Sequence, residues 1–230
     1  MNIELLMKLE KQFKCNENFG DTGLSTFEFQ KGDLPIIITA PHSVKTRKVT
    51  KDGMDVIKEN EGFTGAFALY LNQSFGVHAM VRNNYPYNTF IDPKKEIRDL
   101  IEYIRKNNIK YLVDIHGAHR KRRFDIAPGT SHGRFIEHDE RYKNIIISSF
   151  QQAGILNVDF DTIFQASSEK TISRIIFDEN KIKTTQLEIN KNYRDINLLS
   201  NLRDMLFGLD NYTKNLIELT KEDYPKVYRK

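Results

Sequence analysis

Two histidines lie at the ends of short apolar runs, His42 after residues 36–40 and His116 after residues 111–115. Small residues flank both histidines, which leaves room for a ligand beside each imidazole. A catalytic zinc site typically takes three nitrogen or oxygen ligands and keeps one position open. A single histidine at a strand end is more often a loop or capping residue, but two such histidines together indicate a zinc site.

The third ligand is expected from the segment before the next predicted helix. Glu59 and Glu61 both lie there, and we favour Glu61 because it falls at the helix entry. Cys15 is the only cysteine in the chain, so an internal disulfide and a cysteine-based zinc cluster are both excluded. A tightly held metal must therefore use His, Asp and Glu side chains.

Glu188 is a candidate general base. It lies near the end of the apolar run 184–189, where alternation puts it on one face with Gln186. A carboxylate on a core-like strand is costly to bury unless it is paired or functional. It would take a proton from water and return it to a leaving amine. The alternative is an edge-strand acid that faces water.

The elements that must position these residues alternate between apolar strands and amphipathic helices. We predict a hairpin of residues 25–30 and 34–40, a polar loop over 45–60 and a helix over 61–75 with Glu61 in its first turn. The remaining predicted strands are 78–81, 111–115, 124–127, 158–160 and 184–189, and the remaining helices are 1–13, 93–107, 137–153 and 197–219. This order predicts a single domain, residues 1–230, of the α/β class: a three-layer α/β/α sandwich with a mixed, largely parallel central sheet. In such sheets, ligands bind beyond the carboxyl ends of the strands.

Composition and charge narrow the class of protein. The 39% of hydrophobic residues is enough for a core, and the sequence contains neither a long uncharged apolar window nor a secretory leader, so we expect a cytoplasmic protein without a membrane partner. The net charge of +4 equals the unbroken basic run of residues 120–123. One short basic cluster is too local for a nucleic-acid face, and we expect it to form a positive rim that attracts a small anion.

Four segments, in order, carry a resemblance to a known family. They are residues 38–43 (ITAPHS), 61–65 (EGFTG), 114–117 (DIHG) and 186–188 (QLE), with Tyr193 and Arg194 after the last. Together they resemble the N-formylglutamate amidohydrolase family, which is similar to the zinc carboxypeptidases and the aspartoacylase group. The resemblance spans residues 36–194 and implies a carboxypeptidase-like fold that hydrolyses the amide bond of a small acylated amino acid.

The resemblance also implies roles for individual residues. One Zn²⁺ per chain would be bound by His42, Glu61 and His116, with Glu188 as the general base or acid. Arg82 and Asn88 would hold the substrate or its developing oxyanion. Apart from the resemblance, side-chain chemistry suggests that Arg194 or the basic run, for which we name Arg123, would bind the carboxylate of a small anionic N-acyl amino acid, because a guanidinium matches a carboxylate.

Departures from the family pattern leave the substrate open. Val44 follows the Pro-His-Ser segment where the family often has glycine, and the loop 82–88 lacks an Asp-x-Asn-Arg pattern. Two other functions compete with a zinc amidohydrolase. One is a metal-free relative that binds a small acidic ligand or a protein partner, and the other is a metal-dependent nuclease or nucleic-acid-binding protein.

Overall fold

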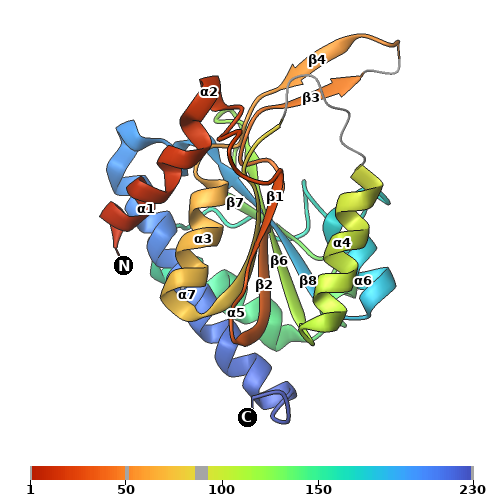
Figure 1. Cartoon of the computed structure of the whole chain (residues 1–230). Helices are drawn as coiled ribbons and strands as arrows, with labels where there is room; N and C mark the ends of the chain where they lie inside the picture. Colours follow the sequence, from red (N-terminus) through yellow and green to blue (C-terminus); the bar gives the residue numbers. More distant parts are fainter. Residues whose placement is uncertain (1, 50–51, 86–92, 229–230) are drawn as a thin grey trace.

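The structure is a computed structural model that describes residues 2–49, 52–85 and 93–228. Within these residues, six strands form a central sheet in the order β1-β5-β2-β6-β8-β7 (Figure 1). These strands are β1 (Phe27–Gln30), β2 (Leu34–Ala40), β5 (Val77–Arg82), β6 (Tyr111–Ala118), β7 (Ile126–Gly129) and β8 (Lys183–Asn190). A separate two-stranded ribbon consists of β3 (Thr46–Val49) and β4 (Asp55–Lys58).

The four central strands, β5, β2, β6 and β8, run parallel to one another. The outer strands β1 and β7 pair antiparallel to β5 and β8. The predicted mixed, largely parallel sheet is therefore confirmed. Central parallel strands are covered on both faces, which explains the almost continuous apolar run of β2.

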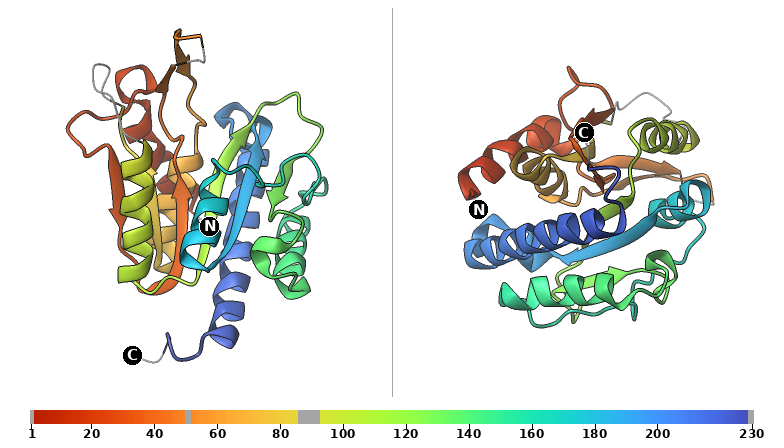
Figure 2. Two further views of the ribbon diagram at one scale, coloured as in Figure 1. Left: turned by 90° about the vertical axis from the view of Figure 1, so that its right-hand side faces the viewer. Right: turned by 90° about the horizontal axis from the view of Figure 1, so that it is seen from below.

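Helices cover both faces of the sheet and form the two outer layers of the sandwich (Figure 2). They are α1 (Ile3–Glu10), α2 (Cys15–Asn18), α3 (Thr64–Phe75), α4 (Pro93–Lys106), α5 (Glu140–Gln152), α6 (Ile172–Asn180) and α7 (Leu199–Asp223). Short 3₁₀ turns cover Lys11–Lys14, Arg134–Ile136, Lys191–Tyr193 and Ile196–Leu198. Across the described ranges, none of the helices combines the length and apolarity needed to cross a lipid bilayer.

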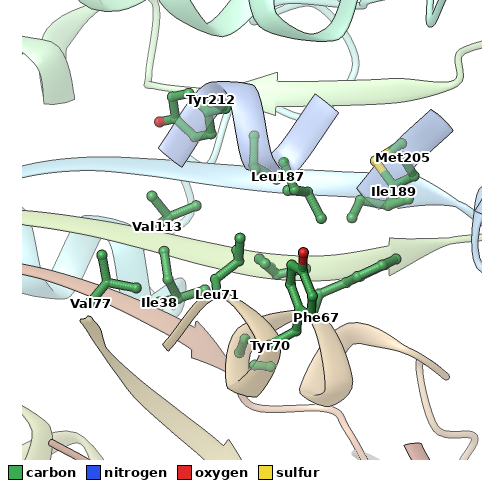
Figure 3. Packing of buried hydrophobic residues seen from close by; sticks show 14 of the residues in the cluster. Ile38, Phe67, Tyr70, Leu71, Val77, Val113, Leu187, Ile189, Met205 and Tyr212 are labelled. Carbon is green, nitrogen blue, oxygen red and sulfur yellow. The ribbon is translucent and has the colours of Figure 1, made fainter. Parts of the chain in front are cut away.

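The core is divided by the sheet. The larger part packs α1, α3, α5 and α7 against one face, with Ile38, Val113 and Leu187 pointing into it (Figure 3). The smaller part packs α4 and α6 against Ile37 and Leu112 on the opposite face. Because side chains alternate along a strand, Asp114 and His116, two and four positions after Leu112, also lie on the face that α4 and α6 cover.

Two strand predictions were wrong. In the described part of the chain, β1 and β2 do not form a hairpin, because β5 lies between them and pairs with both. The segment 158–160 makes only an isolated bridge between Val158 and Ile126. In both cases the apolar pattern indicates that the segment is buried, but it does not indicate which strand pairs with it.

Three further differences concern the segments around the candidate residues. The predicted polar loop 45–60 contains the ribbon of β3 and β4, which stands above the sheet in Figure 1. The predicted helix 61–75 begins only at Thr64, so Glu61 lies in the turn before it. The sequence analysis also missed α6, a short helix of nine residues.

Candidate metal centre and active site

The carboxyl ends of the four parallel strands bring the predicted residues to one edge of the sheet. Arg82 is the last residue of β5, and His42 follows β2 by two residues. His116 and Glu188 lie near the ends of β6 and β8 and are direct neighbours in the register of the two strands. The order β5-β2-β6-β8 therefore places these side chains in a row, as the rule for parallel sheets predicts.

His42, Glu61 and His116 form a group that can hold a metal ion. One ligand atom from each lies within 4.8 Å of the other two. The two imidazole rings have their centroids 5.1 Å apart, and His116 Nδ1 is 3.4 Å from Glu61 Oε2. Glu59 instead points outward, with 74% of its side chain exposed, and pairs with Lys45. The structure therefore brings Glu61, and not Glu59, to the histidines.

Glu61 is held in place by the turn in which it lies. Its backbone N–H donates to the carbonyl of His42 at 2.8 Å, and its own carbonyl accepts from the hydroxyl of Thr64 at 2.7 Å. The carboxylate accepts from the backbone N–H of Gly117 at 2.9 Å and pairs with Lys58 at 3.2 Å. These contacts join the turn before α3 to the ends of β2 and β6.

His116 is oriented by a buried aspartate that the sequence analysis did not assign. Asp114 Oδ2 lies 2.9 Å from His116 Nε2, and Asp114 Oδ1 accepts from the hydroxyl of Thr39 at 2.6 Å. The ring is thereby turned with Nδ1 towards Glu61. A carboxylate on the far nitrogen of a histidine is the usual support for a zinc ligand. The spacing Asp-x-His on a strand was the available signal, because it puts both side chains on one face.

The charges in the group are strongly perturbed by burial and by one another. Burial lowers the pKa of His42 to about 3, against the opposing effect of Glu61. Burial also opposes a charge on His116, but Asp114 and Glu61 outweigh it and raise the pKa well above its usual value. Burial would raise the pKa of Glu61, but His116, His42 and Lys58 together lower it. These shifts favour a neutral His42, an ionised Glu61 and a protonated His116, and a bound metal ion would displace the His116 proton.

These residues fit a zinc ion. Among the described residues, His42 Nδ1 has no hydrogen-bond partner although it is buried, and this is costly unless a ligand satisfies it. Two imidazoles and a carboxylate are the donor set of a known class of catalytic zinc sites. The donor chemistry and the orphaned nitrogen therefore both agree with the predicted ligand set.

A cavity of about 480 Å³ opens beside the two histidines. Glu188 lines it, and its Oε1 accepts from Gln186 Nε2 at 2.9 Å. Burial raises the pKa of Glu188, while His116 acts in the opposite direction. The volume is that of a small-molecule site, and a carboxyl with a raised pKa is suited to proton transfer.

Arg82 also lines the cavity, but it is paired there. Its Nη1 and Nη2 donate to the two carboxylate oxygens of Glu96 at 3.1 and 2.9 Å, and its Nε donates to the carbonyl of Pro41 at 3.0 Å. Burial lowers the pKa of Arg82, and Glu96 acts against that effect. These three hydrogen bonds fix the orientation of the guanidinium beside Pro41, the residue before His42.

The other predicted substrate-binding residues lie away from the cavity or outside the described residues. Arg123 is exposed and is not one of the described residues that border the cavity. Its neighbour Arg122 lies over the ring of Phe164, and Phe164 does border the cavity. Arg194 is buried, and its guanidinium donates to backbone carbonyls. Asn88 lies outside the described residues. The roles of Arg123 and Asn88 stay predictions.

Several cavity residues were missed from the sequence. The cavity is also bordered by the exposed cation Lys170, by Thr171 at the N-cap of α6 and by Ile172, the first residue of α6. Ile97 of α4 adds an apolar wall. No local pattern marks these residues, because they reach the site only when α4 and α6 pack on the sheet.

Comparisons with known proteins support the fold. No family model matches the sequence, and no curated protein matches it. A bacteriophage poly-gamma-glutamate hydrolase has a similar structure, with 15% identity, a TM-score of 0.55, and coverage of 90% of this chain and 95% of the other. The gene product Atu2144 from Agrobacterium tumefaciens is similar at 11% identity and a TM-score of 0.54, over 87% and 98% of the two chains. At such identities the likeness shows that this chain shares their α/β fold.

Proposed function

We propose that this protein is a zinc-dependent hydrolase that cleaves the amide bond of a small, anionic acylated amino acid, as N-formylglutamate amidohydrolases do. The observation that carries the proposal is the convergence of His42, Glu61 and His116 within 4.8 Å of one another, beside a cavity that the two histidines and Glu188 line. Two imidazoles and a carboxylate form one of the known donor sets of catalytic zinc, and a second carboxylate beside them can act as the general base.

The ligands would bind one zinc ion per chain through His42, Glu61 and His116. When bound, zinc supplies a Lewis acid for the scissile carbonyl and lowers the pKa of a water molecule towards neutrality. Asp114 keeps Nε2 of His116 occupied, so that Nδ1 is the nitrogen that faces the metal. Lys58 and Gly117 hold the Glu61 carboxylate against the histidines.

Glu188 would act as the general base and then as the general acid. It neighbours His116 on the adjacent strand, so its carboxylate can reach a water molecule beside the metal ligands. It removes a proton from the water that attacks the carbonyl carbon, and it returns that proton to the amine nitrogen as the carbon–nitrogen bond breaks. Burial raises the pKa of this carboxyl, which makes its carboxylate a stronger base towards water.

Arg82 and Lys170 would bind the substrate from two sides of the cavity. A guanidinium has five N–H groups, and among the described residues Glu96 and Pro41 engage three of those on Arg82. The other two could donate to a carbonyl oxygen or oxyanion. Lys170 is an exposed ammonium at the border of the cavity, where it can meet a substrate carboxylate. This assignment gives Lys170 the role that the sequence analysis gave to Arg123.

Two comparisons support an acylated amino acid as substrate. The ordered segments from residue 38 to residue 194 resemble the N-formylglutamate amidohydrolase family. One of the structures with the same fold is, by name, a poly-gamma-glutamate hydrolase. Both point to a substrate that contains glutamate, and the exposed ammonium of Lys170 at the cavity border agrees with an anionic ligand.

The test begins with the metal content of the untagged protein, purified without chelators. We expect one zinc per chain, lost in Glu61→Gln and retained in the matched control Glu59→Gln. Activity is then screened on N-formylglutamate, other N-acyl amino acids and poly-γ-glutamate. Glu188→Gln should keep its zinc and lose about 10²- to 10⁴-fold in kcat, the usual contribution of general acid–base catalysis.

Three results would each refute part of the proposal. A metal-free parent protein would favour the alternative of a non-catalytic relative that binds a small acidic ligand. A Glu188→Gln variant as active as the Glu59→Gln control would exclude Glu188 as the base. Hydrolysis of poly-γ-glutamate without hydrolysis of N-acyl amino acids would replace the small substrate by a polymer.

A further inference from the structure

Arg194 joins three segments of the backbone through one buried guanidinium. Its Nε donates to the carbonyl of Ile189 at 3.0 Å, its Nη1 to the carbonyl of Gly62 at 2.8 Å and its Nη2 to the carbonyl of Ala118 at 3.2 Å. The residue is 8% exposed. Hydrogen bonds from a buried cation to backbone carbonyls are among the stronger ones in a protein.

Each of these three carbonyls lies beside a residue of the proposed active site. Gly62 follows Glu61, Ile189 follows Glu188, and Ala118 comes two residues after His116. The pairing of β6 with β8 already fixes the last two segments relative to each other. The turn that carries Glu61 is not part of the sheet, so it depends on contacts such as the one between Arg194 and Gly62.

We propose that Arg194 is a positioning residue that fixes the Glu61 turn against the ends of β6 and β8, so that the metal ligands and the general base keep their spacing. This inference rests on the proposed function, and it replaces the substrate-binding role that the sequence suggested for Arg194. The guanidinium is suited to this role because its planar fork donates in three directions at once. A lysine ammonium has one nitrogen and cannot span the same three carbonyls.

Gly117 is the counterpart of Arg194. A Cβ atom added to Gly117 would lie 2.3 Å from Nη2, 2.4 Å from Cζ and 2.8 Å from Nη1 of Arg194. The position must therefore lack a side chain for the guanidinium to reach its partners. Because neighbours along a strand point to opposite faces, the guanidinium lies on the face opposite to the His116 side chain.

This placement argues against direct contact between Arg194 and substrate. The cavity that holds Glu188 is bordered by α4, α6 and the loop before α6. Arg194 borders a different hollow of about 350 Å³, together with Lys14, Arg120 and Lys191. Its hydrogen bonds instead reach Gly62 and Ile189, the residues that follow Glu61 and Glu188.

The test compares two variants that disturb the clamp in different ways. Arg194→Lys keeps the positive charge but loses the fork, and Gly117→Ala keeps the arginine but displaces its guanidinium. We expect both to weaken zinc binding about 10- to 100-fold in competition with a chelator, the usual effect of removing support behind a metal ligand. On a hydrolysed substrate at saturating zinc, kcat should fall while KM changes little.

Two controls separate positioning from general stability. Arg203→Lys is the same substitution at an exposed arginine and should leave zinc affinity unchanged. Leu216→Ala truncates a fully buried side chain of α7 and should lower thermal stability without weakening zinc binding.

Each remaining outcome would overturn the inference in a distinct way. A rise in KM with unchanged zinc affinity would make Arg194 a substrate-binding residue after all. Zinc affinity that falls equally in Leu216→Ala would reduce the effect to lost stability. Parental zinc affinity in both clamp variants would exclude the positioning role while leaving the proposed function intact, and a parent without zinc would overturn both.

Discussion

Asp114 is the residue whose replacement tests the metal centre most directly. It is fully buried, and its two oxygens contact His116 Nε2 at 2.9 Å and the hydroxyl of Thr39 at 2.6 Å. Asp114→Asn has the same shape, so no cavity is created. Its amide oxygen can still accept from the His116 N–H while its NH₂ group turns to the Thr39 hydroxyl, and the change therefore converts a charged hydrogen bond into a neutral one.

The expected loss follows from that difference. A hydrogen bond to a charged group contributes about 1.5–3 kcal/mol and a neutral one about 0.5–1.5 kcal/mol. The difference of about 1–1.5 kcal/mol corresponds to zinc affinity weakened about 5- to 13-fold, around the lower end of what lost support behind a metal ligand costs.

The assay is competition for zinc between the protein and a chromophoric chelator. Alkaline pH is preferable, because Asp114 raises the pKa of His116 and its removal makes the ring easier to deprotonate, which would hide part of the loss at lower pH. Asp99→Asn serves as the matched control, because Asp99 is 44% exposed and pairs only with Lys95 in the described contacts. If Asp114→Asn is folded and binds zinc within about twofold of the parent, Asp114 does not orient His116 and the reasoning fails.

Three further predictions concern stability around the site. Burial raises the pKa of Glu10 from 4.5 to about 7, so between these pH values only the folded state holds a proton on Glu10, and the free energy of unfolding falls as the pH rises through them. In urea unfolding, Glu10→Gln should therefore leave the free energy of unfolding unchanged near pH 4.5. Above pH 7 it should raise that free energy by up to about 3 kcal/mol. The Arg82 side chain is only 9% exposed, and Glu96→Gln removes the counter-charge of its guanidinium. This variant should lose about 3 kcal/mol of unfolding free energy. Gly65→Ala places a Cβ atom 2.5 Å from the ring of Phe13 and should cost about 1–3 kcal/mol by the same measurement.

Each of these predictions has a control in the same molecule. Glu4→Gln removes an exposed carboxylate from the helix that carries Glu10, and an identical pH dependence in both variants would contradict the burial argument. Lys95→Gln breaks an exposed pair on α4, and an equal cost there would show that burial of the Arg82 pair has no effect. Gly23→Ala adds a methyl group on the surface, and a loss as large as that of Gly65→Ala would rule out overpacking as the cause.

Much of the candidate site follows from local patterns. The apolar runs before His42 and His116 predict strands, and histidines at the ends of parallel strands meet at one edge. The preference for Glu61 over Glu59 rests on its position before an amphipathic segment, and the structure brings that carboxylate to the histidines. The alternation around Glu188 correctly places it on the same face as Gln186, to which it is hydrogen-bonded.

Other features depend on contacts between residues far apart in the chain. β1 pairs with β5 because the tertiary fold places β5 beside it. The apolar periodicity of a strand does not indicate which strand will be its neighbour. Arg82 is identifiable at a strand end, but its engagement by Glu96 appears only when α4 packs beside β5. Lys170 reaches the cavity for a similar reason, through the packing of α6.

Arg194 shows most clearly where local reasoning ends. Its sequence context predicts a charged group near the site, and a guanidinium there is equally suited to a substrate carboxylate or to backbone carbonyls. The sequence by itself determined the α/β class, the strand ends and the residue types able to hold zinc, because these depend on local periodicity and side-chain chemistry. Only the tertiary structure decided which partner each charged side chain contacts, because a buried charge pairs with a group that folding brings within hydrogen-bond distance.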